Sequence, residues 1–473
     1  MAGHPTRVLG RGVMVCAVAF ASFASALPVE LKDSNGTKYN INTQVVPFAD
    51  LSNASGALTN ATFVKPVTVT SYYIGITPWF GFLTTYTVQR EVNVPLRPAF
   101  QGFNGLAITG VNGQKLVVPL VFNPGQPLAA EGCAANGKNR ELTFATQTFG
   151  SQNLTLTRKA YVPNNQEWVR WQNIVTNTGA APTQVAITLL GVVASGANTK
   201  VVNTSTGNTS LTTAETWFTT AQSVPQGTTS FQPRIGYVLQ GPGATAPVAN
   251  LGISTTSTPP GKTAFSYTPT IPAGGSVNIL TFVTVQGKSK AAKSTCEGIV
   301  KTPLPSATIK CMSERELAQV VNFAPVTPPV LKNATVKLQF NKTGQDTAQW
   351  KGKITIGAGI SLAGLPVIVD LGGVVQTFVL KKGGSANNGN GNKFNLDATL
   401  SNGVTKAGTY SFSFNFKGDL QTAFAEYGLT DSNADNVAVA IPLSMNAGGP
   451  GFAVDQPFTY NATQGKSGTA KAS

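Results

Sequence analysis

The chain has 473 residues, of which only 11% are charged, and its formal net charge at pH 7 is +15. This length is enough for two or three domains with large cores, and the abundance of Gly, Thr, Asn, Ser and Val favours short strands joined by turns over helices. The single histidine is His4. A chain that loses its N-terminus therefore lacks the imidazole that a Ser-His-Asp triad, a Cys-His pair or a His-ligated metal requires.

The N-terminus has the pattern of a secretory signal peptide. Arg7 and Arg11 precede an apolar run over residues 13–23, and the small residues Ala24, Ser25 and Ala26 follow it. We expect residues 1–26 to be removed, which leaves a chain that begins at Leu27 with a formal charge of +13, since two of the fifteen net positive charges leave. No later run is long enough for a transmembrane helix. The predicted location is secreted, periplasmic or at the cell surface.

Residues 27–323 are predicted to form a large β-sandwich domain that ends in two short helices. Strand-like runs at 174–175 and 185–193 flank the turn residues 176–179. The first helix is expected over 290–300. The second opens at Ser313, which forms a capping box with Glu316.

An aromatic stretch early in this region is the first candidate for binding. It contains Tyr72, Tyr73, Trp79 and Tyr86. If these rings are exposed, they could stack on the faces of sugars. Because the residues lie in strand-like segments, we favour the alternative, in which the rings pack against one another across strands in a core.

The cysteines predict one disulfide. Loss of Cys16 with the signal peptide leaves Cys133, Cys296 and Cys311, which allow three pairings. The Cys296–Cys311 pair is favoured because the loop between them is short, and three buried thiols are the alternative. Without histidine or a Cys-x-x-Cys spacing, neither a metal site nor a cofactor is expected.

Catalysis would then depend on carboxylates, Lys, Tyr or a bound cofactor. A glycosidase needs two carboxylates about 5 to 9 Å apart. Glu167 beside Trp168 and Glu215 near Trp217 are the best pair that the sequence offers, although a surface position is favoured for either glutamate.

A Pro-rich linker is expected at 324–330, followed by a second β-sandwich domain over 331–463 and a polar tail over 464–473. Phe412, Phe414 and Phe416 alternate with polar residues, which places them on one face of a strand. Asp419 is expected to cap one helix, and residues 383–392 are expected to form a loop. The predicted fold class is therefore all-β, with two β-sandwich-type domains and a few short helices.

Asp431, Asn433 and Asp435 imitate the first positions of a calcium loop. The central glycine is absent, and Pro442 stands at the twelfth position, where calcium loops carry a bidentate glutamate. A solvated turn is the favoured interpretation.

Several segments together resemble a β-sandwich region that recurs in large exported bacterial proteins of uncharacterised function. The resemblance covers roughly residues 150–323 and is carried by the segments 176–179, 203–205, 214–217 and 272–275. It implies export and β architecture, and no functional residue is carried over from it.

The basic charge favours an anionic polysaccharide or a cell-surface component as partner. No motif interleaves aromatic with basic residues, so nucleic acid is not expected, and the lysines are scattered along the chain. The sequence favours a secreted binding or structural protein without enzymatic activity. The alternatives are a carbohydrate-active or polysaccharide-binding protein and a self-assembling subunit of a surface layer or filament, whose copies would associate through strand edges.

Overall fold

The protein is all-β, as predicted. The computed structural model describes residues 28–34, 36–45, 51–55, 57–76, 83–125, 127–128, 133–135, 138–208, 210–223, 232–448 and 451–472, with 65–94 at the level of the backbone. The predicted signal peptide, residues 1–26, lies outside these ranges. Within them, the helices are short: α1 (Ser289–Ile299), α2 (Ser306–Ile309), α3 (Glu314–Ala318) and α4 (Gln421–Ala425). Single 3-10 turns lie at η1 (Leu51–Asn53), η2 (Gly150–Gln152) and η3 (Gly196–Asn198).

The N-terminal part is a sandwich of two nine-stranded sheets in the described part of the chain. The first sheet has the order β1 (Val29–Lys32), β2 (Lys38–Ile41), β3 (Leu58–Thr62), β6 (Phe100–Val111), β15 (Thr183–Val193), β20 (Lys262–Tyr267) and β19 (Val248–Ser254), with β7 (Gln114–Val121) on β6 and β21 (Thr270–Ile271) on β15. The second has the order β16 (Thr199–Thr204), β17 (Trp217–Gln222), β18 (Arg234–Val238), β22 (Ser276–Gln286), β14 (Val169–Asn177), β13 (Leu154–Tyr161), β11 (Glu141–Phe144) and β8 (Pro127–Leu128), with β12 (Gln147–Phe149) on β13.

Apolar side chains at alternate positions of both sheets form one core. Leu154 and Leu156 of the second sheet share it with Ile187 and Leu189 of the first, and all four are fully buried. Because the side chains of a strand alternate between faces, this period of two places one row of each strand inside.

The C-terminal part is a single eleven-stranded sheet that curls into a nearly closed, barrel-like form. Its order is β27 (Val374–Val379), β26 (Pro366–Leu371), β33 (Ala434–Asn446), β34 (Gly451–Thr463), β35 (Ser467–Ala472), β24 (Val330–Leu338), β25 (Asp346–Ile356), β32 (Gly408–Gly418), β29 (Lys393–Asp397) and β28 (Ser385–Asn387), with β23 (Val326–Thr327) parallel to β34. The side chains of Asn388 and Asn392 donate to Gln376 Oε1 of β27 at 2.7 and 3.3 Å, which ties together the two ends of the sheet.

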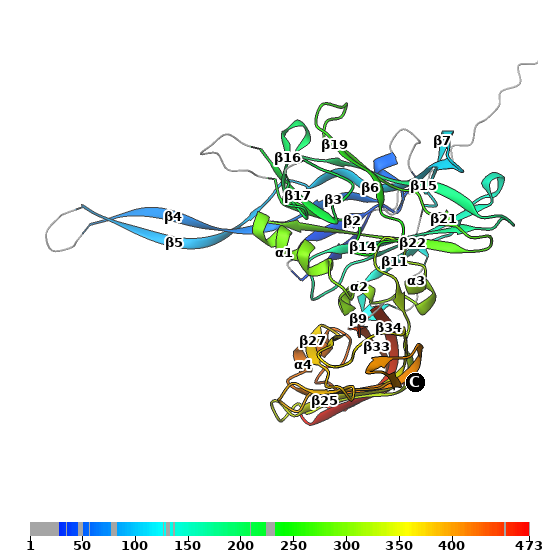
Figure 1. Cartoon of the computed structure of the whole chain (residues 1–473). Coiled ribbons are helices and arrows are strands. Elements are labelled where there is room, and N and C mark those ends of the chain that lie inside the picture. The colour runs from blue at the N-terminus through cyan, green and yellow to red at the C-terminus, as the bar shows by residue number, and fades with distance from the viewer. Residues whose placement is uncertain are drawn as a thin grey trace, which may run out of the picture.

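The predicted phenylalanine row is confirmed in this second core. Phe412, Phe414 and Phe416 are each at most 3% exposed, and Phe414 stacks on Trp350. Figure 1 shows this part below the N-terminal sandwich, with α1, α2 and α3 on the side of the sandwich that faces it.

Four expectations about chain segments are wrong. The polar tail at 464–473 contains β35, which pairs with both β34 and β24. The linker at 324–330 contributes β23 and the first residue of β24 to the C-terminal sheet. The loop at 383–392 contains β28. Asp419 does not cap α4, whose N-cap residue is Leu420. In each case pairing with a distant strand or the geometry of the neighbouring turn outweighs the polar composition that suggested the prediction.

The helices that end the N-terminal part number three within the described ranges, rather than two. The capping box is confirmed, because Ser313 accepts from the Glu316 backbone while the Glu316 side chain accepts from the Ser313 backbone. The helix expected over 290–300 is confirmed as α1, and α2 lies between the two predicted helices.

Three two-stranded antiparallel pairs complete the described fold: β4 (Val64–Ile76) with β5 (Leu83–Pro95), β9 (Ala134–Ala135) with β10 (Lys138–Asn139), and β30 (Leu400–Ser401) with β31 (Val404–Thr405). The β4–β5 hairpin, which we call the arm, extends away from the body as a two-stranded ribbon (Figure 1).

Candidate functional site: a lysine-rich sheet face

The outward side of the C-terminal sheet carries rows of lysine and small polar residues. Positions that alternate with the buried phenylalanines point outward, and strand pairing aligns these positions across neighbouring strands. One row runs through Lys471, Thr335, Gln349, Asn415 and Lys393, whose residues are successive partners in the ladders of β35, β24, β25, β32 and β29.

Parallel rows add further lysines on the same face. Lys337 pairs with Thr347, which pairs with Lys417. Two residues further along β25 from Gln349, Lys351 is aligned with Ser413. We call this surface the lysine face and define it by six residues: Lys337, Lys351, Lys353, Lys393, Lys417 and Lys471.

The lysines of this face carry little counter-charge among the described residues. None of the six forms an ion pair within the part of the chain that the structure describes. All are exposed except Lys353, which is half-buried. Their rows contain the carboxylate of Asp397, which pairs with Ser411; Ser411 in turn pairs with Lys353. The face therefore presents a net positive charge to the solvent.

Two other acidic residues of the C-terminal part, Asp346 and Asp370, lie elsewhere for structural reasons. Asp346 is fully buried and accepts from the backbone amides of Gln339 and Leu420. Asp370 accepts from the backbone amides of Ser306 and Gly373. Because these carboxylates satisfy buried donors, they leave the outer charge of the sheet unbalanced.

A groove lies within the lysine face, with a cavity volume of about 530 Å³. Its charged lining residues are Lys351, Lys381 and Lys393. Asn415 lines it as well and donates through Nδ2 to the Gly391 carbonyl at 3.2 Å. The groove thus combines three ammonium groups with the exposed polar side chains of Gln349, Ser385 and Asn387, a set suited to a ligand that carries both carboxylates and hydroxyls.

The two glutamates considered for catalysis do not share a cavity. Glu167 lines a cleft of about 610 Å³ between the N- and C-terminal parts and accepts from Gln286 Nε2 at 2.7 Å. Glu215 is fully buried and accepts from Thr206 and Ser205. Burial acts to raise the pKa of Glu215, but these bonds outweigh it and hold the pKa below its usual value. Glu215 therefore fixes a turn, and the structure does not bring the pair together.

The backbone of the aromatic stretch lies on the arm. Tyr72 and Tyr73 belong to β4 and Tyr86 to β5, and Tyr73 is the direct ladder partner of Tyr86. Trp79 lies outside the described residues. β4 and β5 pair with each other and with no other described strand. Packing of these rings in a core stays a prediction.

The candidate calcium residues hold two turns together. Asp431 Oδ1 accepts from the Gly465 backbone at 2.6 Å, and Asn433 Oδ1 accepts from the Gln464 backbone at 3.0 Å. Asp435 Oδ1 accepts from the side chain of its neighbour Asn436. Among the described residues, no group of three or more His, Cys, Asp or Glu side chains is arranged to hold a metal ion.

The disulfide joins Cys133 to Cys311, so the predicted Cys296–Cys311 pair is wrong. The Cα atoms of Cys133 and Cys311 lie 5.6 Å apart, a separation that a disulfide spans readily. Cys296 is a free thiol on α1, fully buried against Gly236 of β18. Burial raises its pKa, which keeps it protonated and unreactive. The prediction relied on the short loop between Cys296 and Cys311. Loop length does not show in which direction α1 points the side chain of Cys296.

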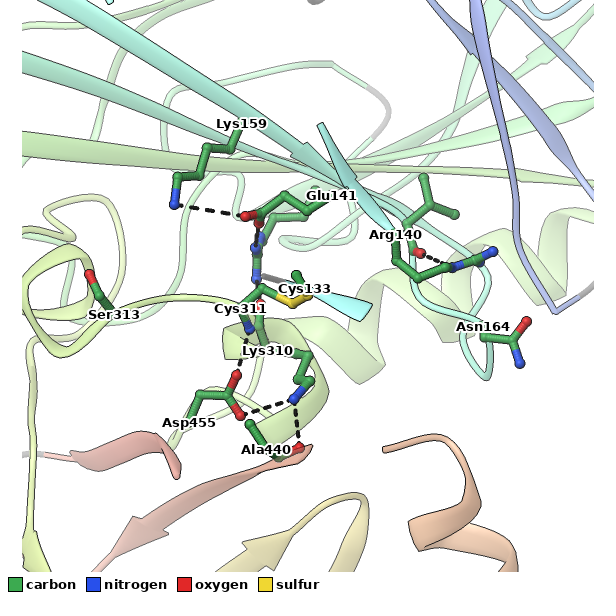
Figure 2. The surroundings of a disulfide bond; sticks show 12 residues. Cys133, Arg140, Glu141, Lys159, Asn164, Lys310, Cys311, Ser313, Ala440 and Asp455 are labelled. Atoms are coloured by element: carbon green, nitrogen blue, oxygen red, sulfur yellow. Dashed lines mark hydrogen bonds and ion pairs between the residues drawn. A yellow bond between two sulfur atoms is a disulfide. The ribbon is translucent and has the colours of Figure 1, made fainter. Parts of the chain in front are cut away.

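The disulfide lies at the junction between the two parts of the molecule (Figure 2). Next to Cys311, Lys310 donates to the Ala440 carbonyl at 2.6 Å and forms an ion pair with Asp455 at 3.3 Å. Asp455 also accepts from the Cys311 backbone at 2.8 Å. These contacts fasten the segment after α2 to β33 and β34 of the C-terminal sheet.

On the other side of the junction, Arg170 is fully buried and binds Glu141 at 3.0 Å. Its guanidinium also donates to the carbonyls of Thr308 and Lys310. Lys159 reaches both Glu141 and Glu316, at 3.7 and 2.6 Å. Burial raises the pKa of Glu141 to about 7, against the opposing effect of Arg170 and Lys159. With this set of partners, the network fastens β11, β13 and β14 to the segment that contains α2 and α3.

Comparisons with known proteins do not assign the chain to a family. No family model and no curated protein matches it. Similar solved structures include a polysaccharide lyase, at 8% identity and a TM-score of 0.27, with 82% of this chain and 46% of the lyase covered. A putative aldose 1-epimerase from Klebsiella pneumoniae is similar at 10% identity and a TM-score of 0.23, with 50% of this chain and 90% of the epimerase covered. The chain thus spans about half the length of the lyase, and likenesses at these TM-scores carry no conclusion about function.

Among the residues that the structure describes, no helix is long and apolar enough to span a membrane.

Sequence reasoning missed the lysine face, because it found the lysines scattered along the chain. They are scattered in sequence and gathered by strand pairing: Lys337, Lys393 and Lys471 come from three different strands. A usable signal was present. Between residues 331 and 472 there are twelve lysines and no arginine, and several of these lysines alternate with the apolar residues of predicted strands.

Proposed function

We propose that this is an exported, non-catalytic binding protein that holds an acidic polysaccharide on the lysine face. The observation that carries the proposal is the alignment of unpaired lysines in rows across neighbouring strands.

The spacing of the rows supports a polymeric ligand. Strands lie about 4.8 Å apart, so Lys471 and Lys393, separated by four strand spacings, lie roughly 19 Å apart along one row. A chain of acidic sugars offers charges repeated over such a distance, whereas a small anion reaches one or two lysines. The serine, threonine, asparagine and glutamine side chains between the lysines supply partners for sugar hydroxyls.

Lysine rather than arginine favours a diffuse, charge-based contact. An ammonium group is a strongly hydrated point charge on a flexible stem, without the planar fork that binds a single carboxylate in a fixed geometry. Such a face binds a polyanion with strong dependence on salt, because exposed charges are screened over about 8 Å at physiological ionic strength.

The test compares retention of the purified protein on alginate, which is acidic, with retention on dextran, which is neutral. The variant carries Lys351→Gln, Lys393→Gln and Lys417→Gln. Three exposed charge contacts of about 0.5 kcal/mol each sum to about 1.5 kcal/mol, so we expect about tenfold weaker binding to alginate.

The matched control carries Lys115→Gln, Lys200→Gln and Lys290→Gln, which removes the same charge from exposed lysines of the N-terminal part. It should bind alginate like the unaltered protein. If both variants lost the same amount of alginate binding, the effect would come from net charge alone. Retention on dextran as strong as on alginate would overturn the proposal. Shortening of the polysaccharide would show that the protein is an enzyme.

A further inference from the structure

The arm is long and narrow, and no other described strand pairs with it. β4 and β5 form thirteen consecutive ladder pairs, from Val64 with Pro95 to Ile76 with Leu83. At about 3.3 Å per residue, thirteen residues extend roughly 43 Å. An isolated two-stranded ribbon is at best marginally stable in water, and each strand presents a row of unpaired backbone groups along its outer edge.

The outer half of the arm is uncharged. Residues 71–76 and 83–88 contain no Asp, Glu, Lys or Arg, and the arm carries its charges towards the body, at Lys65, Arg90 and Glu91. These uncharged segments are rich in β-branched and aromatic residues, which favour strand pairing. Natural edge strands are commonly protected from pairing by charge, and the outer half of the arm lacks this protection.

The separation between the charged body and the uncharged outer half of the arm suits a second copy of this chain as the partner. The chain carries a net charge of +15, so the bodies of two copies repel each other. Ser71 is seven residues from the start of β4, roughly 23 Å along the ribbon, which exceeds the screening length of about 8 Å. Two copies can therefore touch through the outer halves of their arms while their charged bodies stay far enough apart for most of the repulsion to be screened.

Of the two edges, that of β5 is the better template. Residues 83–94 contain neither Pro nor Gly, whereas β4 contains Pro66 and Gly75, which weaken a strand edge. A lipid surface suits the arm less well, because a single hairpin in lipid leaves both rows of edge groups without partners.

We propose that two copies of this chain associate by antiparallel pairing of the β5 edges of their arms, which forms a four-stranded sheet with twofold symmetry. The same edge contributes from each copy, as twofold symmetry requires. This association is independent of the lysine face.

Sedimentation velocity of the purified chain from 1 to 100 μM, in 0.15 M and 0.5 M NaCl, tests the proposal. We expect a concentration-dependent dimer that is stronger at the higher salt, because salt screens the repulsion between the bodies while leaving the uncharged contact intact. Thr85→Lys places like charges at the paired edges and should weaken association at least tenfold. Val117→Lys adds the same charge at a fully exposed site of β7 and should leave it unchanged.

A second variant removes the outer half of the arm without disturbing its base. Thr70 and Gln89 are ladder partners, so Asn-Gly in place of residues 71–88 closes the shortened hairpin with a two-residue turn. This variant should be monomeric at 100 μM and bind alginate normally. A strictly monomeric unaltered chain at both salt concentrations would overturn the proposal, as would dimerisation that survives the shortening. A monomer that co-sediments with phosphatidylcholine vesicles would identify a lipid surface as the partner instead.

Discussion

Two arginines of neighbouring strands show how differently a buried charge can be accommodated. Arg170 faces the junction and has a carboxylate and two carbonyls as partners. Arg158 lies fully buried on the core side of β13, and its guanidinium nitrogens have no hydrogen-bond partner within the protein. Burial lowers the pKa of Arg158 to about 9, and the ring of Trp171, 5.8 Å away, offers a cation–π contact in place of a counter-ion. Buried charges without partners are costly, so Arg158 is a point of weakness in the sandwich core.

Glu141 gives a prediction about pH. Its pKa in the folded protein is about 7, above the ordinary value of 4.5, so between these values the folded protein binds more protons than the unfolded chain. The contribution of Glu141 to stability therefore falls as pH rises from 4.5 to 7. Relative to Glu141→Gln, the unaltered protein should lose on the order of 3 kcal/mol of unfolding free energy across this window. Urea unfolding at pH 4.5, 6 and 7.5 measures the difference.

Glu297→Gln is the control, since Glu297 is about half exposed and forms a surface ion pair with Lys293. Its pH profile should run parallel to that of the unaltered protein. A parallel profile for Glu141→Gln as well would show that Glu141 remains ionised throughout, held by Arg170.

At the level of elements, β35 is the clearest case of a strand that its sequence conceals. The segment is short and rich in Ser, Gly, Thr and Lys, which is typical of a disordered end. In the structure it fills the gap between β34 and β24, and Ala470 is fully buried in the C-terminal core. The ladder partners of Ala470 are Tyr460, 10 residues away along the chain, and Val336, 134 residues away.

Removal of residues 467–473 tests the role of β35. The truncation leaves the facing edges of β24 and β34 unpaired and opens the sheet, so we expect the unfolding midpoint of the chain in guanidinium chloride to fall. Lys471→Gln, which keeps the strand and removes one exposed charge, should change the free energy of unfolding by less than about 0.5 kcal/mol. A truncated chain with the unaltered midpoint would mean that β35 does not contribute to the closure of the sheet.

For the whole molecule, the junction decides whether the two cores behave as one unit. A third apolar cluster, which includes Trp168, Phe282, Phe323 and Ala453, lies between them. The disulfide closes a loop of 178 residues and ties the Cys133 segment to the end of α2, where the contacts to the C-terminal sheet begin. Coupling through a packed cluster, a buried ion pair and a covalent bond predicts cooperative unfolding of both parts.

Asp455→Ala tests this coupling by calorimetry. The substitution leaves Lys310 buried without its counter-charge and the Cys311 amide without its acceptor, at a cost of about 3–5 kcal/mol. We expect one thermal transition for the unaltered protein and two for the variant. Asp435→Ala, at an exposed position of β33, should retain the single transition at nearly the same temperature. A single, unshifted transition in Asp455→Ala would rule out this ion pair as the connection.

The sequence by itself determined what depends on local patterns. Alternation of apolar residues predicted the strands and the all-β class, as in the row from Phe412 to Phe416, and the spacing of Ser313 and Glu316 predicted the capping box. These signals can be read locally because a strand repeats every two residues and a cap involves residues three apart.

Only the tertiary structure decided which distant residues meet. Strand pairing gathered Lys337, Lys393 and Lys471 on one face, and the orientation of α1 gave Cys311 a partner other than Cys296. Pairing also placed β35 inside a sheet and left the arm without neighbouring strands. These outcomes depend on contacts between residues far apart in the chain, and a local pattern of side chains is compatible with many such pairings.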